Sequence, residues 1–300
     1  MANLYHAYGL TFASEIELPE LALAPDASQP PQVQISLGAV PPQGLAGGRQ
    51  ISPFIWVADG QFWLEVPDIA RFLVRDGAQI VVQPAPSIDM ASVRVFLLGS
   101  GLGALLFQRG LLVLHGNAIE MGQGCLVCVG PSGVGKSTLT AAFMQRGYRV
   151  LADDVVPIND QGMAIPGFGR IKLWQDVADR LQISTDGLQR IRPQLEKFNL
   201  PLGDAFCDSP RKVVQICLLS EHLDDDITQS PVTGIEKFTL LRANTYRQRF
   251  MAGMALQPQH LQQCGALAGQ VAITRVARPK SGFRIDDLVD ALAAQMQGAR

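Results

Sequence analysis

The stretch GPSGVGKST, residues 130–138, decides the fold, and it fills every position of the pattern G-x-x-x-x-G-K-[ST]. Before it, GCLVCVG (124–130) is a solid apolar run and predicts a strand covered on both faces. After it, residues 137–146 predict a helix that ends at Gly147. A strand, a glycine-rich turn and a helix in this order aim backbone N–H groups and the positive end of a helix at one point. The stretch therefore predicts a phosphate-binding loop of the Walker A type.

The residues of this loop have separate expected roles. Lys136 is expected to bridge the β- and γ-phosphates of a nucleoside triphosphate, and the Ser137 hydroxyl to bind Mg²⁺. We therefore expect ATP and Mg²⁺ as ligands. The expected nucleotide-binding residues are Gly130, Pro131, Ser132, Gly133, Val134, Gly135, Lys136, Ser137 and Thr138. The loop leaves the reaction open, because switch proteins, motors and transporter ATPases share it.

Two adjacent aspartates, Asp153 and Asp154, end the apolar stretch YRVLA (148–152) that follows the helix of the loop. A kinase needs one carboxylate for Mg²⁺ and another to accept the proton of the attacking hydroxyl, whereas a switch protein or motor needs one and a positioned water. Neighbouring strand residues point to opposite faces, so the two carboxylates should differ in role, one facing the γ-phosphate and one supporting Lys136 or the metal. A solvated strand end explains the pair equally well on spacing alone, and the nearby loop favours function.

Four stretches together resemble the catalytic domain of HPr kinase/phosphorylase and its free-standing serine-kinase relatives. They are LVLHGNAIEM (112–121), GPSGVGKSTL (130–139), GYRVLADDVV (147–156) and PGFGRIKLW (166–174). The resemblance covers roughly residues 110–300, and phosphoenolpyruvate carboxykinases share the arrangement more distantly. It implies an α/β P-loop kinase domain of the HPr kinase/phosphoenolpyruvate carboxykinase type.

The resemblance also implies roles for single residues. Asp153 would be the base toward the substrate serine, and Asp154 its partner in metal or lysine contacts. His115 matches the family histidine near the phosphates, although a lone histidine at a strand end is otherwise an ordinary core or surface residue. The expected catalytic residues are Asp153, Asp154, His115 and Lys136, and the expected metal ligands are Ser137, Asp153 and Asp154.

Three basic residues after the aspartates are candidates for substrate binding. Arg170 and Lys172 lie on an expected strand and could neutralise the transferring phosphoryl group or hold a peptide carboxylate. An alternating strand with two basic residues facing solvent is the alternative. Lys197, in LEKFNLPL (195–202), matches a basic position of the serine-kinase relatives.

The implied activity is transfer of the γ-phosphoryl group of ATP to a serine hydroxyl of a peptide or small protein. The glycine-rich second signature of HPr kinases is not found after the aspartates, and YHAYGLTFASEIELPEL (5–21) looks like the N-terminus of the smaller relatives. Several of these phosphorylate the C-terminal serine of lasso-peptide precursors, which are ribosomally made peptides, so such a precursor is an expected acceptor. The alternatives are an HPr(Ser) kinase, a nucleotide-binding regulatory ATPase and a small-molecule kinase.

The chain divides, by pattern, into a β-rich domain over residues 1–90 and the kinase domain over residues 91–300. Short alternating runs predict a small antiparallel domain, for which substrate docking is a hypothesis. Its expected strands begin at residues 33, 54, 61, 71 and 79. The expected elements after it are a helix over 89–108, strands over 111–121, 148–158, 213–219 and 271–277, and helices over 235–250 and 285–296.

Composition bounds the remaining possibilities. The chain has 300 residues, 47% hydrophobic and 17% charged, which is typical of a globular protein. A formal charge of −2 gives no overall attraction to nucleic acid or anionic lipid, and the apolar run 96–107 is too short to span a bilayer. The N-terminus has no export signal and the five cysteines are scattered, so we expect a cytoplasmic protein. Cys125 and Cys128 form C-x-x-C inside the buried strand, where they should point to opposite faces instead of forming a redox pair or zinc site. Assembly into a homo-oligomer is left open.

Overall fold

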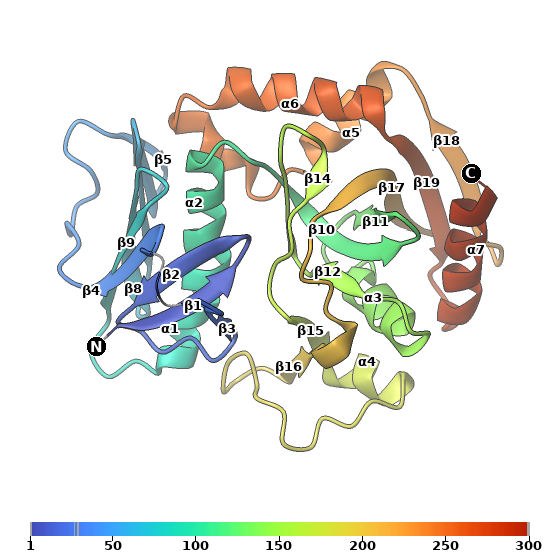
Figure 1. The fold of residues 1–300 in the computed structure, drawn as a ribbon, viewed down its shortest axis with the longest axis horizontal. Coiled ribbons are helices and arrows are strands. Elements are labelled where there is room, and N and C mark those ends of the chain that lie inside the picture. The colour runs from blue at the N-terminus through green and yellow to red at the C-terminus, as the bar shows by residue number, and fades with distance from the viewer. Residues whose placement is uncertain (1, 27, 29, 299–300) are drawn as a thin grey trace.

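The computed structural model describes every residue except 1, 27, 29, 299 and 300, and it contains two large sheets (Figure 1). The first is nine-stranded, with the order β3-β1-β2-β4-β9-β8-β7-β6-β5. Its strands are β1 (Asn3–Ala7), β2 (Leu10–Ser14), β3 (Ala22–Leu23), β4 (Val33–Leu37), β5 (Arg49–Ser52), β6 (Ile55–Ala58), β7 (Gln61–Val66), β8 (Ala70–Arg75) and β9 (Gln79–Pro84).

The expected antiparallel arrangement of this sheet is only partly right. The strands from β5 to β9 form an antiparallel meander joined by short turns, as their alternating pattern predicts. By contrast, β4 pairs in parallel with both β2 and β9. Parallel neighbours need a long connection, which the proline-rich segment 24–32 supplies before β4 and the whole meander supplies after it.

One long helix packs against this sheet (Figure 1). It consists of α1 (Met90–Phe96), a π-helical turn η1 (Leu97–Gly101) and α2 (Leu102–Gln108). The Asp89 side chain caps it by accepting a hydrogen bond from the Ser92 N–H at 2.7 Å. By length and composition, this helix is apolar enough to cross a membrane. However, 78% of its most apolar 18-residue stretch is buried within the fold, so it is a core helix.

The core of the nine-stranded sheet extends past residue 90. It includes Leu97, Leu102 and Leu105 of the helix, each fully buried, together with Tyr246 and Phe250 from far along the chain. Burying a side chain of this size contributes about 1.5–3 kcal/mol, so this shared core ties the two sheets firmly together. The division at residue 90 therefore stays a prediction.

The second sheet has eight strands, with the path β11-β10-β13-β14-β17-β19-β18 and β12 paired to β10. Because β11 also pairs in parallel with β17, the strands β11, β10, β13, β14 and β17 form a closed ring of neighbours within this sheet. The strands are β10 (Leu112–Met121), β11 (Gly124–Val129), β12 (Val150–Ala152), β13 (Val155–Ile158), β14 (Met163–Ala164), β17 (Arg211–His222), β18 (Thr228–Val232) and β19 (Ala272–Pro279).

Helices cover this sheet on both faces, giving the mixed α/β architecture that was predicted (Figure 1). The remaining elements are α3 (Lys136–Gln145), α4 (Gln175–Arg180), α5 (Ile235–Ala243), α6 (Gln257–Gln270), α7 (Ile285–Gly298), the short 3-10 helices η2 (Gly203–Ala205) and η3 (Gln248–Gly253), and the two-stranded sheet β15 (Arg170–Trp174) and β16 (Lys197–Pro201). Cys128 faces the core under α3 and α7, whereas Cys125 faces the core under α5 and α6. The prediction that the two cysteines point to opposite faces is confirmed.

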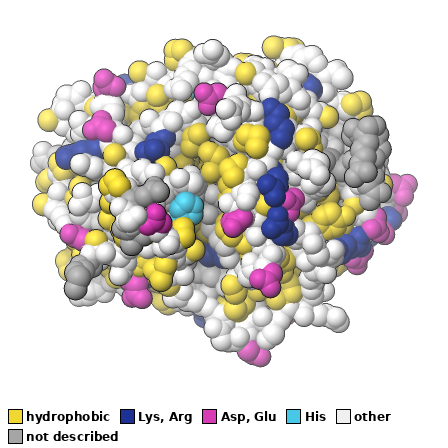
Figure 2. Space-filling view, viewed as in Figure 1, with side chains coloured by type: hydrophobic (Ala, Val, Ile, Leu, Met, Phe, Trp, Pro, Cys, Tyr) yellow, Lys and Arg dark blue, Asp and Glu magenta, His cyan; other side chains and the backbone are white. Residues whose placement is uncertain are grey.

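Two expected elements differ from the structure. The expected strand over 148–158 breaks into β12 and β13 at the aspartate pair, where Asp154 has a φ of 75°. The register against β10 is the same on both sides of the pair, since His115 pairs with Val155 and Ala118 with Ala152, so the turn at Asp154 interrupts the strand without changing its register. The expected helix over 235–250 ends at Ala243, where the Asn244 side chain donates to the Leu240 carbonyl at 2.9 Å. Basic and acidic side chains are interspersed over the face in Figure 2, as the near-zero net charge suggests.

Candidate active site

The glycine-rich loop (residues 130–137) leads from the end of β11 into α3 and takes backbone angles that favour glycine. The φ values are 147° at Gly130, 84° at Gly133 and 98° at Gly135. A Cβ at Gly130 would lie only 2.4 Å from the Leu219 carbonyl oxygen of β17. The loop therefore rests closely on the neighbouring strand and wraps the N-terminus of α3, the geometry expected of an anion-binding turn.

Lys136 is held beneath this loop. Its side chain is almost buried, with the residue 8% exposed, and Nζ donates to the carbonyl oxygens of Gly130 and Pro131 at 2.9 Å each. Burial lowers the pKa of this ammonium, while the nearby carboxylates of Asp154 and Asp153 raise it. The lysine thus fixes the curvature of the loop and places a positive charge inside it.

Asp153 is bound to the loop and to its neighbours by three hydrogen bonds. The Ser137 hydroxyl donates to Oδ1 at 3.0 Å, the Asn117 amide donates to the same oxygen at 2.6 Å, and the Lys172 backbone N–H donates to Oδ2 at 2.8 Å. Asn117 also donates to the Thr140 hydroxyl at 2.7 Å, which fixes the amide on α3. Both oxygens of Asp153 are therefore oriented before any ligand binds.

Asp154 has different partners, as the sequence predicted for two neighbouring carboxylates. Lys172 Nζ lies 3.1 Å from Oδ2, and His115 Nδ1 lies 3.2 Å from Oδ1. The same ring nitrogen lies 3.1 Å from the Asp154 carbonyl oxygen, and because both neighbours are acceptors, Nδ1 carries the proton. Burial raises the pKa of the Asp154 carboxyl, but Lys172 and His115 outweigh burial and hold that pKa well below its ordinary value.

The oxygen atoms around Ser137 fit a magnesium ion. The Ser137 hydroxyl and the Asp153 carboxylate are adjacent, and the Asn117 side-chain oxygen is buried beside them without a hydrogen-bond partner. Mg²⁺ prefers oxygen ligands and is usually held by one or two carboxylates together with waters and substrate phosphates. In the described part of the chain, no group of three or more His, Cys, Asp or Glu side chains is placed to hold a metal ion.

Of the three expected metal ligands, Ser137 and Asp153 come together, and Asp154 turns instead to Lys172 and His115. Neither aspartate contacts Lys136 through a hydrogen bond, because the Lys136 ammonium donates to the carbonyl oxygens of the loop. The two carboxylates act on Lys136 only through their charge, which raises its pKa.

A cavity of about 500 Å³, which we call the central cavity, joins these groups. Its lining includes the glycine-rich loop, His115, Asp154 and three lysines, Lys136, Lys172 and Lys197. Burial lowers the pKa of Lys197, whose ammonium lies 5.2 Å from the centroid of the Trp174 ring. Three ammonium groups around one small space suit a polyphosphate.

Arg170 does not line the central cavity, unlike the other two expected substrate residues. Its guanidinium bonds to the Asn199 side chain of β16 and lies 5.4 Å from the centroid of the Phe168 ring. Burial lowers the pKa of this group. Arg170 and Lys172 lie two positions apart on β15, a spacing that predicts one shared face. The contacts of Arg170 with Asn199 of β16 and with Phe168 nevertheless direct its side chain away from the central cavity.

Two further cavities adjoin the central one. The first, of about 660 Å³, shares His115, Ser132 and Asp154 with it and extends to residues 218–220 and 243–247; we call it the distal cavity. The second, of about 210 Å³, shares Gly133, Gly135, Thr138, Asp176 and Val177 with it.

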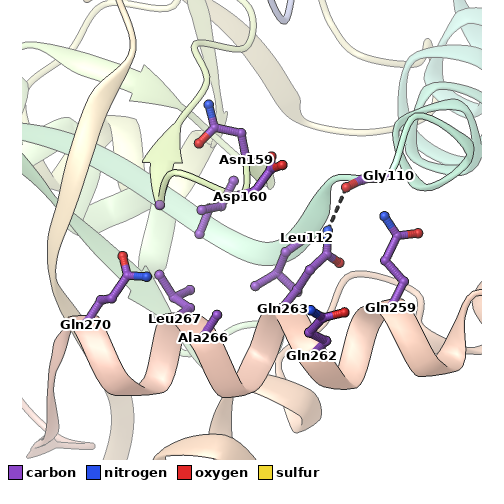
Figure 3. Close-up of a pocket in the computed structure, with 12 residues that line it drawn as sticks. Gly110, Leu112, Asn159, Asp160, Gln259, Gln262, Gln263, Ala266, Leu267 and Gln270 are labelled. Atoms are coloured by element: carbon purple, nitrogen blue, oxygen red, sulfur yellow. Dashed lines mark hydrogen bonds between the residues drawn. The ribbon is translucent and has the colours of Figure 1, made fainter.

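A fourth cavity, of about 290 Å³, lies apart from the glycine-rich loop, between α6 and the turn after β13 (Figure 3). Glutamines of α6 surround it, and one of them, Gln263, donates to the Gly110 carbonyl at 2.6 Å. Asp160 is the one charged residue in its lining, so this cavity offers little acid–base chemistry.

Asn117 is the main site residue that sequence reasoning missed. It lies two positions after His115 on the same strand, and residues two apart on a strand share a face. That spacing, in a stretch whose histidine was already a candidate, is the signal that would have found it.

Comparison with known proteins finds relatives in the family that the sequence motifs resemble. Three HPr kinase/phosphorylases, from three strains of Streptococcus thermophilus, are each 28% identical over 185 residues, which cover 59% of this chain and 52% of the relative. The chain is distantly homologous to the HPr kinase/phosphorylase family. It spans about half the length of these relatives, and no family model matches it. The solved structure of the HPr(Ser) kinase/phosphatase from Coxiella burnetii is similar at a TM-score of 0.29 and 13% identity, over 63% of this chain and 95% of that chain.

Proposed function

We propose that this protein is an ATP-dependent serine kinase that transfers the γ-phosphoryl group to a peptide or small protein. The observation that carries the proposal is the position of Asp154 and His115, which line both the central and the distal cavity. An ATPase needs a nucleotide site and a water, whereas a kinase needs a second binding site on the far side of its reactive carboxylate. The distant homology to HPr kinase/phosphorylase also supports a kinase.

The residues divide the work between charge and proton transfer. Lys136, Lys172 and Lys197 would hold the phosphates in the central cavity. Ser137 and Asp153 would hold Mg²⁺, which would neutralise charge on the phosphates.

Asp154 is the better candidate for the base, although the resemblance implied Asp153. Three hydrogen bonds already engage Asp153, whereas Asp154 faces both cavities. The serine oxygen would bond to the γ-phosphorus as the bond to the bridging oxygen of ADP breaks, and the serine proton would pass to Asp154. A phosphoryl transfer with a loose transition state asks its base mainly to orient the hydroxyl, so a low pKa is compatible with this role.

The distal cavity is the proposed acceptor site. Its lining surface is mostly apolar, with the exposed Arg247 on its wall. The Arg247 guanidinium is ordered by packing 5.4 Å from the centroid of the Tyr246 ring, which suits it to pair with a carboxylate. A peptide that ends in serine, as lasso-peptide precursors do in the related kinases, would present its hydroxyl and its C-terminal carboxylate together. All five cysteines are buried and free, which agrees with the proposed cytoplasmic setting.

Mass spectrometry of candidate acceptors tests the proposal. The protein is incubated with Mg²⁺, ATP and either a peptide ending in serine, the same peptide ending in alanine, or HPr. We expect one phosphoryl group on the serine peptide, none on the alanine peptide, and loss of transfer with Asp154→Asn. Modification of HPr alone would keep the kinase and reject the peptide acceptor, and steady ATP hydrolysis with no acceptor modified would favour a regulatory ATPase.

A further inference from the structure

The cavity of about 210 Å³ lies between the glycine-rich loop and the segment that follows β19. On the loop side it is lined by Gly133, Gly135 and Thr138, and on the other sides by residues 278–280 and 282–285 and by Asp176, Val177 and Arg180 of α4. It has no assigned role in the phosphoryl transfer proposed above. We call it the proximal cavity.

The three adjoining cavities have a fixed order. The central cavity meets the distal one at His115, Ser132 and Asp154, and it meets the proximal one at Gly133, Gly135, Thr138, Asp176 and Val177. If the γ-phosphate of a nucleotide lies beside Asp154, the rest of that molecule must leave the central cavity at the opposite end. That end opens into the proximal cavity.

The proximal cavity is lined by an aromatic ring with a cation over its face. The Arg180 guanidinium of α4 lies 5.6 Å from the centroid of the Phe283 ring, and that phenylalanine is 41% exposed. Aromatic rings and guanidinium planes are the surfaces on which nucleobases stack, whatever the base.

The segment that presents Phe283 is tied to the glycine-rich loop. Arg278 donates to the Val134 carbonyl oxygen from Nε at 3.2 Å and from Nη2 at 3.1 Å, and the same guanidinium pairs with Glu221. This contact holds the segment at a set distance from the loop, so that a ligand can touch both.

We infer that the proximal cavity binds the nucleobase of the phosphate donor, with the base packed against Phe283 and the Arg180 guanidinium that lies over the Phe283 ring. The inference rests on the proposed phosphate-binding role of the glycine-rich loop and adds the subsite that distinguishes a nucleotide from a bare polyphosphate.

Calorimetric titration with two ligands separates this inference from the proposed function. ATP and inorganic tripolyphosphate are each titrated, with Mg²⁺, into the wild type, Phe283→Ala and Phe283→Trp. Phe54→Ala is the matched control, because Phe54 is similarly exposed, at 46%, but lies beside the other sheet. We expect Phe283→Ala to weaken ATP roughly 5- to 150-fold, as the loss of one stacking contact predicts, and to leave tripolyphosphate unchanged. Phe283→Trp should retain ATP affinity, and Phe54→Ala should alter neither ligand.

Four other outcomes of these titrations would contradict the inference. Equal weakening of both ligands by Phe283→Ala, or no weakening of ATP, would overturn the nucleobase subsite while leaving the phosphate site intact. Wild-type binding of tripolyphosphate as tight as that of ATP would do the same. Failure of the wild type to bind either ligand would overturn the phosphate site itself, and the subsite with it.

Discussion

Replacing Lys172 with methionine should raise the pKa of the Asp154 carboxyl, because the ammonium 3.1 Å away is a main cause of its depression. Two unit charges at that separation interact by roughly 5 kcal/mol at an effective dielectric constant of about 20. The Asp154 side chain is 31% exposed, so solvent reduces this value. A neighbouring cation typically lowers an aspartate pKa by about 1–3 units, which is the size of the change we expect. Because His115 still lies 3.2 Å from the carboxylate and lowers its pKa, the pKa should rise toward the ordinary value of about 3.9 without exceeding it.

Carbon-detected NMR of the carboxyl resonances follows this pKa directly and needs no acceptor. Asp154→Asn assigns the resonance, and Lys172→Arg keeps the charge as the matched control. The reasoning is refuted if methionine moves the pKa by less than about half a unit, or if arginine moves it as far as methionine does. If Asp154 is the base, the acid limb of the pH profile of kcat/KM should shift upward with the pKa in Lys172→Met.

Three further predictions concern other parts of the structure. Hydrogen bonds from Arg149 and Arg211 lower the pKa of Glu120 from 4.5 to about 2, so the stabilisation they give is complete above about pH 4.5 and is lost as the pH falls toward 2. Urea unfolding of Glu120→Gln should then show a flatter pH dependence than the wild type in that window, and parallel curves would contradict this. Gly130→Ala should lower stability by about 1–3 kcal/mol and weaken ATP binding, because its φ of 147° and the 2.4 Å approach of a carbonyl leave no room for a Cβ; an unchanged melting temperature and Kd would show that the loop tolerates the change. Asn117→Leu removes a donor to Asp153 and should raise the Mg²⁺ concentration needed for half-maximal ATP binding more than it lowers stability, whereas an unchanged Mg²⁺ requirement would assign Asn117 a purely structural role.

Local patterns of sequence predicted much of the fold. The glycine-rich loop, its strand and helix, the long helix after Asp89 and the meander from β5 to β9 follow from periodicity and turn residues, which act within a few positions of the chain. The weakly periodic α6 was not predicted, since only His260, Cys264 and Leu267 of its side chains are buried.

Features that depend on distant segments were not predicted. The break at the aspartate pair places Asp154, at a φ of 75°, against His115 of β10 and Lys172 of β15, and the two parallel pairings of β4 require a meander that closes far along the chain. Arg170 was expected beside Lys172, but contacts from Asn199 and Phe168 draw it away. The sequence predicted that the two adjacent carboxylates would differ in role. It could not predict which of them accepts a hydrogen bond from Ser137, because that depends on how β10, α3 and β15 pack together.

The fate of the γ-phosphate tests the kinase assignment most directly. With γ-labelled ATP, Mg²⁺ and a peptide ending in serine, the fraction of released label bound to peptide is compared with the fraction appearing as free phosphate. The account predicts that most of the label is on the serine peptide and that Asp154→Asn abolishes this transfer, with Asp160→Asn, in the separate cavity of Figure 3, unchanged. Label that appears only as free phosphate, at a rate the peptide does not alter, would contradict it.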